Sequence, residues 1–393
     1  MNIKEIFQRI LRVAWREVHL FSHRPLCLFC AMIAPIFCTI FFTSLMYKGL
    51  PTDLPAGVVD EDNTKTTRQI IRTLDALENT NIVAEYSNFS EAREAMQQGK
   101  IYAFFYIPKG TTAKAIASRQ PKISFYTNET YFVAASLLMR DLRLSSELVG
   151  LAITRQTLYA KGATERQAMG IIQPITVEAH PLKNPYLNYS VYLNNVIIPG
   201  ILFLLVMLIT AYSIGEEWKK GTQKEWYELG GRSSTVALIG KLLPQTLLFW
   251  LMIVFIDVYL YEYLAFPCNS GISHMILVGM LTVLASQGFS IFVFGIVPGQ
   301  LRLAMSTCSL WGVVSFSISG MSFPVSAMAR PLQVAAELFP LRHYFLIYVN
   351  QALDGYSIFY VWHSVVALVI FTILPMFVLW RYRSAIFNNK YVP

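Results

Sequence analysis

The sequence predicts a membrane all-α bundle of six transmembrane helices with an inserted α+β extracytoplasmic domain. Only 14% of the 393 residues are charged and 54% are hydrophobic, whereas about a quarter of the residues in soluble domains are charged. Six apolar stretches have the length, about 20 residues, that crosses a bilayer: residues 26–47, 191–214, 242–266, 275–297, 303–322 and 361–380. Residues 48–190, between the first two stretches, hold 16 of the 32 basic and 14 of the 24 acidic residues. This composition excludes a typical cytosolic enzyme.

The distribution of Lys and Arg predicts the orientation, because positively charged flanks stay in the cytoplasm. With the N-terminus inside, the short outer segments hold only Arg330 and Arg342, and fourteen basic residues flank the spans on the cytoplasmic side. Six spans return the C-terminus to the cytoplasm, so residues 48–190 face outward. We therefore expect an integral protein of the bacterial inner (plasma) membrane with transmembrane helix 1 at 26–47, transmembrane helices 2–6 at 191–382 and a cytoplasmic tail at 383–393.

Residues 1–25 are expected to form a cytoplasmic amphipathic helix in the membrane interface. Apolar residues recur at helical spacing from Ile3 to Phe21, with Lys4, Arg9 and Arg12 at other positions, and a helix of this kind lies along a leaflet with its apolar stripe among the acyl chains. The apolar stretch that follows is interpreted as a retained anchor, because its leader and its apolar core are too long for a signal peptide.

The outer domain is expected to open with a β-α-β-α-β pattern. Its strand-like runs cover 56–59, 82–86, 101–107 and 123–126, and a last strand is expected at 175–179. Ser90 is the expected N-cap of the second helix, which Gly99 closes, and residues 129–160 have the apolar spacing of one extended helix. The domain has no Gly-x-Ser-x-Gly and no His-Glu-x-x-His motif, so we interpret it as a binding or docking module and not as an enzyme.

The segment 215–232, between the second and third spans, combines many charges with two tryptophans. We expect a short amphipathic helix on the inner membrane face, with its charges pointing to the cytosol. Two readings of its chemistry remain open. In the first, a partner protein binds the charged face of the helix. In the second, the segment anchors the chain at the inner membrane face through its positive charges and interfacial tryptophans.

A family resemblance rests on two stretches. In the first, Glu216 and Glu217 precede Gly221–Thr222 and a further acid, which resembles the coupling helix of type-2 ATP-binding-cassette (ABC) exporter permeases. The second, from Gly320 to Tyr344, resembles the segment between the fifth and sixth spans of that family. The chain as a whole resembles the family branch with a large extracytoplasmic domain between the first and second spans. It departs from the family at Lys224, where an acid is usual, so Glu225 is a candidate for the displaced acid.

The resemblance implies a permease subunit of an ATP-driven ABC exporter, which moves an amphipathic or hydrophobic substrate such as a drug, a lipid or a lipid-linked molecule. No Gly-x-x-x-x-Gly-Lys-Ser/Thr phosphate loop occurs in the chain, so we expect no catalytic residue, no metal and no cofactor on it, and ATP with Mg²⁺ on the partner. The implied partners are two ABC ATPase subunits, a second copy or a homologous permease, and membrane lipids. A periplasmic adaptor is compatible, and no nucleic acid is expected. The alternatives are a cell-envelope assembly permease of the same family and a membrane-anchored receptor or adaptor.

Two sets of site residues are expected, the first from the resemblance and the second from the aromatic and proline content of the segment between the fifth and sixth spans. Coupling to the ATPase is assigned to the segment 215–232 through Glu216, Glu217, Gly221, Thr222 and Glu225. The outer gate is assigned to 323–353, a re-entrant segment of two short helices, through Phe323, Pro324, Phe339, Pro340 and Phe345.

Asp257 is the one ionisable residue that this reading places within a span, and such a residue is a functional candidate. Counting about 1.5 Å per residue from Lys241 places it about 24 Å up the helix, near the outer interface. We therefore expect Asp257 at the interface and not in a transport path.

Overall fold

The computed structural model describes residues 3–117, 119, 121–173, 178, 180, 183–184, 187–388 and 391–392. The chain divides into two compact units, Met1–Gly49 with Pro181–Pro393, and Leu50–His180. The first, which we call the helical unit, consists of helices. The second, which we call the sheet unit, is built on a four-stranded sheet.

Six helices within the described residues are long and apolar enough to cross a membrane: Pro25–Leu45, Tyr189–Lys220, Ser234–Tyr263, Ile272–Ile296, Leu301–Ile318 and Ile358–Asn388. They coincide with the six predicted spans, which confirms a membrane protein. The helices reach beyond several of the apolar stretches, most clearly at Lys220, because a helix continues until a cap or a glycine ends it.

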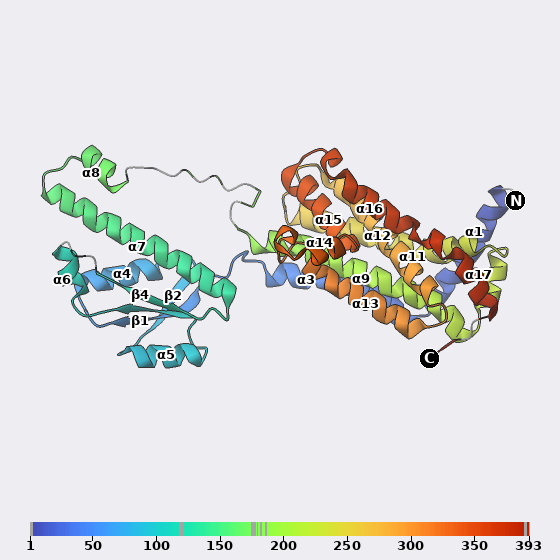
Figure 1. Cartoon of the computed structure of the whole chain (residues 1–393), viewed down its shortest axis with the longest axis horizontal. Coiled ribbons are helices and arrows are strands. Elements are labelled where there is room, and N and C mark those ends of the chain that lie inside the picture. The colour runs from blue at the N-terminus through green and yellow to red at the C-terminus, as the bar shows by residue number, and fades with distance from the viewer. Residues whose placement is uncertain are drawn as a thin grey trace. The chain divides into compact units, whose positions relative to one another are not determined.

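The first span combines α2 (Pro25–Leu28), a π-helical turn at Phe29–Ile33 and α3 (Ala34–Leu45). It follows α1 (Ile3–Ser22), the predicted N-terminal helix. The next spans are α9 (Tyr189–Lys220), α11 (Ser234–Asp257) with a π-helical turn at Val258–Tyr263, α12 (Ile272–Ile296) and α13 (Leu301–Ile318). The last contains α16 (Trp362–Ile373) and α17 (Leu379–Asn388), and Figure 1 labels all of these helices except α2.

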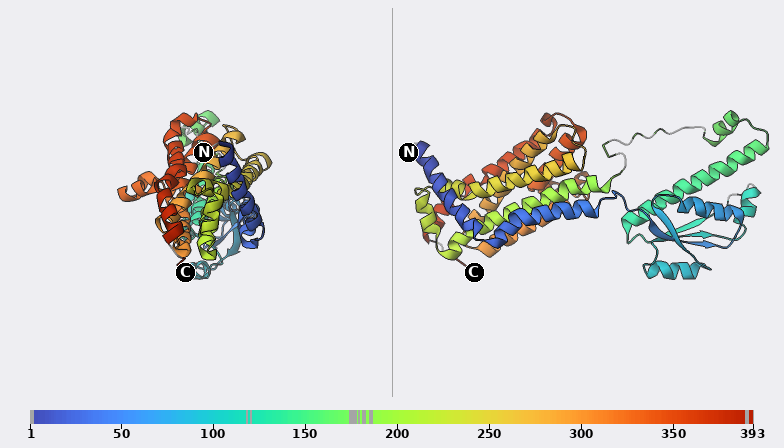
Figure 2. Two further views of the ribbon diagram at one scale, coloured as in Figure 1. Left: turned by 90° about the vertical axis from the view of Figure 1, so that its right-hand side faces the viewer. Right: turned by 180° about the vertical axis from the view of Figure 1, so that it is seen from behind.

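The packing of the helical unit is centred on α9, which contacts α3, α12 and α13. On its periphery α1 lies along α11, and α12 lies along α16. Gly288 allows the second of these contacts, since a Cβ atom there would lie 2.3 Å from the Phe371 carbonyl oxygen. Both views show α1 and α17 at the same end of this unit (Figures 1 and 2), as an even number of spans requires.

The sheet unit has the strand order β2-β1-β3-β4. The strands are β1 (Leu54–Asp60), β2 (Thr80–Glu85), β3 (Ala103–Ile107) and β4 (Ser124–Thr127). The first three run parallel and β4 pairs antiparallel with β3. The helices α4 (Lys65–Asp75) and α5 (Phe89–Gln97) supply the two crossovers, so the predicted β-α-β-α-β order is confirmed.

Alternating side chains on the strands divide the core of the sheet unit into two layers. Val58 and Phe105 pack with α4 and α7 (Phe132–Ala160), whereas Val59 and Phe104 pack with α5 on the opposite face. Figure 1 shows α4 and α7 above the sheet and α5 below it. The extended helix predicted at 129–160 is therefore present as α7 and covers one sheet face.

One detail of the sheet unit corrects the sequence analysis. The N-cap of α5 is Asn88 and not Ser90, because Asn88 Oδ1 accepts a hydrogen bond of 2.9 Å from the Glu91 amide. Gly99 follows the helix with φ +73°, as the prediction requires. Most of the strand expected at 175–179 lies outside the described residues.

Candidate functional site

Within the segment 215–232, α9 ends at Lys220 in a glycine cap. Gly221 has φ +72°, and its amide donates to the Trp218 carbonyl at 3.2 Å. The Thr222 amide donates to the Glu217 carbonyl at 2.9 Å. These two bonds form the Schellman arrangement, which needs a residue in the left-handed conformation that glycine adopts without strain. The chain then turns into α10 (Gln223–Leu229).

Glu217 joins four segments of the helical unit. Its carboxylate accepts two bonds from the Arg16 guanidinium of α1, at 2.8 and 3.1 Å. It accepts a third from Lys241 Nζ of α11 at 2.7 Å and a fourth from the Thr222 hydroxyl at 2.5 Å. The last turn of α9, the start of α10, α1 and α11 are thus joined at one side chain.

Glu17, on α1, forms the second centre of the same network. It accepts hydrogen bonds from Lys241 Nζ at 2.7 Å, from the Ser213 hydroxyl at 2.8 Å and from Gln245 Nε2 at 3.2 Å. Lys241 therefore lies between two carboxylates that belong to different helices. Its side chain is fully buried, at 0% exposure.

Glu216 completes the network on the side of α2. It pairs with Arg24 at 2.5 Å and with Lys220, one turn further along α9, at 2.9 Å. Arg24 also lies 3.7 Å from Glu17. We call the resulting set the ion-pair cluster: Arg16, Glu17, Arg24, Glu216, Glu217 and Lys241.

The ion-pair cluster balances its charges, with three acidic and three basic members. Moving an ion from water into the protein interior costs on the order of several kcal/mol of free energy, unless ionic partners and hydrogen bonds compensate for the lost hydration. Here Lys241, Glu17 and Glu217 are each at most 2% exposed, and every one has partners on other helices. The cluster thus constrains α1, α9 and α11 to one relative arrangement, and it can change only when several pairs break together.

The helix α10 carries the accessible part of this region. Trp226 and Tyr227 are buried, and Trp226 Nε1 donates to the Ala237 carbonyl at 3.0 Å. Lys224 and Glu225 are exposed on the other side of the helix. Glu225 is 65% exposed and lies 3.9 Å from Arg16 Nε, so a group that binds Glu225 would also act on the cluster. The predicted short amphipathic helix is present.

The structure separates the five predicted coupling residues. Gly221 and Glu225 are exposed, so a partner protein can contact both directly. Thr222 is half-buried and is only partly accessible to such a partner. The expectation that the charges of this loop point outward is wrong for Glu216 and Glu217, which are buried. The cause is that α9 extends to Lys220, so both glutamates face the helical unit while Lys219 and Lys220 face away from it.

Four members of the ion-pair cluster were not among the predicted site residues: Arg16, Glu17, Arg24 and Lys241. The signal for Glu17 was present, because it lies four residues after Val13 and four before Phe21, on the apolar stripe of α1. Lys241 was assigned to the cytoplasmic flank of a span. It is instead the eighth residue of α11 and faces the helical unit.

The predicted gate residues are also divided. Phe339 stacks on Trp311 of α13 with 4.7 Å between ring centroids, and Pro340 opens α15 (Pro340–Tyr348) in a buried position. Phe345 is half-buried on α15, whereas Phe323 and Pro324 are exposed. The two short helices expected in this segment are present as α14 (Arg330–Ala336) and α15.

Asp257, expected near the outer membrane interface, is buried within the helical unit. Its side chain is 2% exposed at the end of α11, and its Oδ2 atom has no hydrogen-bond partner among the described residues. Counting residues along a helix gives the height of a side chain but not the direction in which it points, and Asp257 points into the helical unit.

Among the described residues no group of three or more His, Cys, Asp or Glu side chains could hold a metal ion. The arrangement at this end of the helical unit is therefore one of ion pairs between helices, next to an exposed amphipathic helix. It can transmit a displacement of α10 to α1, α9 and α11.

These features define a multi-span membrane protein in which one charged loop is joined to the helical unit through buried ion pairs. The family model described as ABC-2 family transporter protein matches residues 26–381, and the chain belongs to this family. It is thus an ABC transporter membrane component, and membership implies association with an ABC ATPase. Among curated proteins, none matches the chain at a significant level.

Proposed function

We propose that the chain is the permease subunit of an ATP-driven exporter and that α10 receives the force from the ATPase. The observation that carries the proposal is the position of Glu217, which bonds Thr222 at the start of α10 and at the same time Arg16 and Lys241. A displacement of Gly221, Thr222 or Glu225 therefore acts directly on the ion-pair cluster.

The mechanism requires two arrangements of the spans that the ATPase stabilises differently, because a ligand shifts an equilibrium only through its differential affinity. In one arrangement the ion-pair cluster is closed, as in this structure. In the other, ATP-driven closure of the partner subunits displaces α10, and the exchange of ion pairs lets α1 and α11 move relative to α9. Glu216 and Glu217 act inside the helical unit, and Gly221 and Glu225 form the contact.

The complete transporter would contain two ABC ATPase subunits, which bind ATP and Mg²⁺, and a second permease, identical or homologous. It would lie in a bacterial plasma membrane with both termini and α10 in the cytoplasm and residues 48–190 outside. The cargo proposed is amphipathic or hydrophobic, with drugs, lipids and lipid-linked molecules as the candidates. The segment 323–353, with its aromatic residues and prolines, is proposed as the exit gate.

The first prediction tests the contact between α10 and the ATPase. We expect that the tagged chain, purified from its native membrane in mild detergent, recovers an ABC ATPase. We expect Glu225→Lys to reduce that recovery at least tenfold, since it reverses an exposed charge. The substitution also removes the ion pair between Glu225 and Arg16, at 3.9 Å. This loss changes the stability of the fold little, because exposed ion pairs contribute about 0–1 kcal/mol.

The matched control is Glu262→Lys, which reverses an exposed acid at the far end of Ser234–Tyr263, the span that follows α10. It should leave recovery of the ATPase unchanged. Recovery of the ATPase by Glu225→Lys at the wild-type level would remove α10 as the contact. A well-folded wild-type chain that recovers no ATPase in several mild detergents would count against the permease itself.

A further inference from the structure

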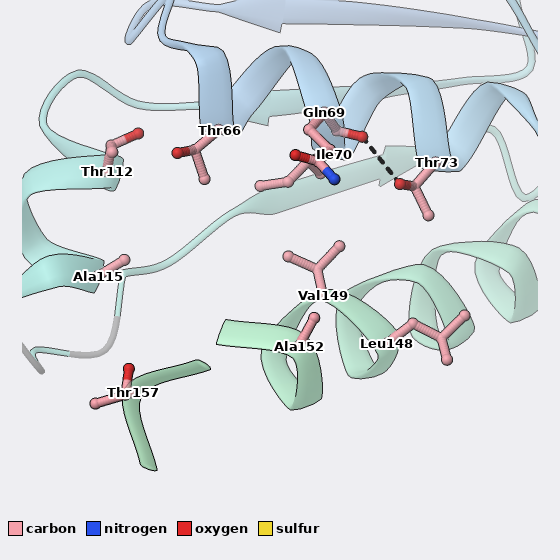
Figure 3. Close-up of a pocket in the computed structure, with 10 residues that line it drawn as sticks. All are labelled: Thr66, Gln69, Ile70, Thr73, Thr112, Ala115, Leu148, Val149, Ala152 and Thr157. Atoms are coloured by element: carbon pink, nitrogen blue, oxygen red, sulfur yellow. Dashed lines mark hydrogen bonds between the residues drawn. The ribbon is translucent and has the colours of Figure 1, made fainter. Parts of the chain in front are cut away.

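The sheet unit contains a groove between α7 and the helices α4 and α6 (Thr111–Ile116). Two adjoining cavities of about 620 and about 1030 Å³ share lining residues on all three helices, among them Ile70, Thr112 and Val149. Figure 3 shows Thr66, Ile70 and Thr112 across an open space from Val149 and Ala152. Ligand sites of small molecules measure roughly 300–1,000 Å³, so the groove has the size of such a site.

The groove exists because α7 is longer than the sheet beneath it. A helix of 29 residues is about 43 Å long, whereas the longest strand has 7 residues and is about 23 Å long. The first half of α7 is fixed to the sheet unit, where Asp141 accepts hydrogen bonds from Asn79 and Thr80. After Ser145 no side chain of α7 is buried among those the structure describes.

The groove has mainly apolar walls, and its charged lining residues are cationic. Ile70 and Leu74 of α4, Phe105 of β3, and Val149 and Leu158 of α7 supply the apolar surface. The cations are Arg119, Lys122 and Lys161, and no carboxylate lines the groove within the described residues. Ser145, 1% exposed, also lines it, and its hydroxyl has no hydrogen-bond partner in the described part of the chain.

We propose that this groove binds an amphiphile with one long apolar chain and an anionic headgroup, of the class of fatty acids and lysophospholipids. The apolar chain would cover the second half of α7, and the headgroup would meet Arg119, Lys122 and Lys161. A peptide fits less well along α4, α6 and α7, because the backbone groups of a helix are already paired and offer nothing to a peptide backbone. Binding needs neither ATP nor an ATPase, so the site stands independently of the proposed transport.

The experiment uses the full-length chain in nanodiscs of phosphatidylcholine and a photoreactive palmitate that carries a diazirine. Crosslinked peptides are mapped by mass spectrometry, and unlabelled competitors are added before irradiation. We expect crosslinks in residues 142–161, which comprise the second part of α7 and Lys161 directly after it. Palmitate and lysophosphatidic acid should displace the probe at concentrations at least tenfold lower than hexadecanol or hexadecyltrimethylammonium. The ratio of the effective concentrations of palmitate and lysophosphatidic acid distinguishes a fatty acid from a phospholipid as the source of the ligand.

Gly150→Leu is the sharpest variant, because Gly150 lines the groove and a Cβ atom there meets no atom within 4 Å. A leucine side chain there adds volume to the groove from a Cβ position that meets no atom, and leucine favours the helix more than glycine does. We expect at least a fivefold loss of crosslinking. The matched control is Gly170→Leu in α8 (Glu165–Ile172), where a Cβ atom also meets nothing and which does not line the groove.

The double variant Lys122→Gln with Lys161→Gln tests whether the groove needs its positive charges. The control is Lys100→Gln, because Lys100 is exposed and does not line the groove. The first pair should lower crosslinking at least fivefold and the control should not. Three results would overturn the proposal: crosslinking that Gly150→Leu does not reduce, equal displacement by neutral and anionic competitors or by inorganic phosphate alone, and a copurified polypeptide crosslinked in the groove. Melting curves of each variant establish that it is folded.

Discussion

Lys241 holds a full charge inside the helical unit, with Glu17 and Glu217 each 2.7 Å from its Nζ atom. Such a charge is tolerated only while both carboxylates remain, and removal of one member of a buried ion pair costs about 3–5 kcal/mol. We expect Lys241→Met to lower the thermal midpoint of the purified chain by several degrees, since two buried carboxylates then lose their common partner. Scanning fluorimetry in detergent measures the shift.

The control for Lys241→Met is Lys219→Met, which removes an exposed charge on α9 and should leave the midpoint nearly unchanged. Adding Glu17→Gln to Lys241→Met should recover part of the loss, because Glu17 then has only Arg24, at 3.7 Å, as an ionic partner, whereas Glu217 keeps its two bonds from Arg16. Equal midpoints for the two single variants would show that the ion-pair cluster contributes nothing to stability.

At the scale of residues, the sequence predicted the exposed positions of the charged loop better than its buried ion pairs. Gly221 and Glu225 were identified from a local pattern, and both are exposed. The partners of Glu217 are Arg16 and Lys241, and Arg16 is 201 positions away along the chain. No local pattern specifies a pair at that separation, because the pairing depends on how α1 packs against α9 and α11.

At the scale of elements, the pair α14 and α15 is attached to α13 by an aromatic contact, a hydrogen bond and the packing of Ile318 against Ala336 and Phe339. Phe339 stacks on Trp311, and Trp311 Nε1 donates to the Leu338 carbonyl at 3.0 Å. We expect Phe339→Ala with Phe345→Ala to loosen this pair and to change both the ATPase rate of the reconstituted complex and the efflux of a hydrophobic fluorescent dye. Removal of a buried phenylalanine costs about 3–5 kcal/mol.

The comparison for that double variant is Phe359→Ala, which removes a ring that is 79% exposed between α15 and α16. It should leave the ATPase rate and the dye efflux as they are in the wild type. If the double variant is expressed normally, has lost stability and still transports at the wild-type rate, then α14 and α15 are structural and the exit gate lies elsewhere.

The elements themselves were largely predictable because their signals are local. Short β-prone apolar runs predicted β1 and β3, and helical spacing predicted α4 and α7. The ends of elements were less predictable. Asn88 replaces Ser90 as the cap of α5, since both residues can cap and only the folded backbone selects one. Likewise, hydropathy falls after Ile214, although α9 continues to Lys220 until Gly221 ends it.

At the scale of the whole molecule, composition indicated a membrane protein, and the positions of Lys and Arg predicted its orientation. The structure adds that α1, α10 and α17 belong to one end of the helical unit, where α10 contacts both of the others. A partner that binds α10 would therefore lie beside both ends of the chain. Because ATP is cytoplasmic, the proposed function requires that this end face the cytoplasm.

Single cysteines and a membrane-impermeant maleimide test this orientation in spheroplasts. In a variant that lacks the five free cysteines of the native chain, we expect Lys109→Cys, exposed in the sheet unit, to be labelled from outside. Lys224→Cys, exposed on α10, should be labelled only after lysis. Labelling of Lys224→Cys in intact spheroplasts would place the coupling surface where no ATP is available. That result would refute the export mechanism but leave the amphiphile groove standing, because the groove needs no ATPase.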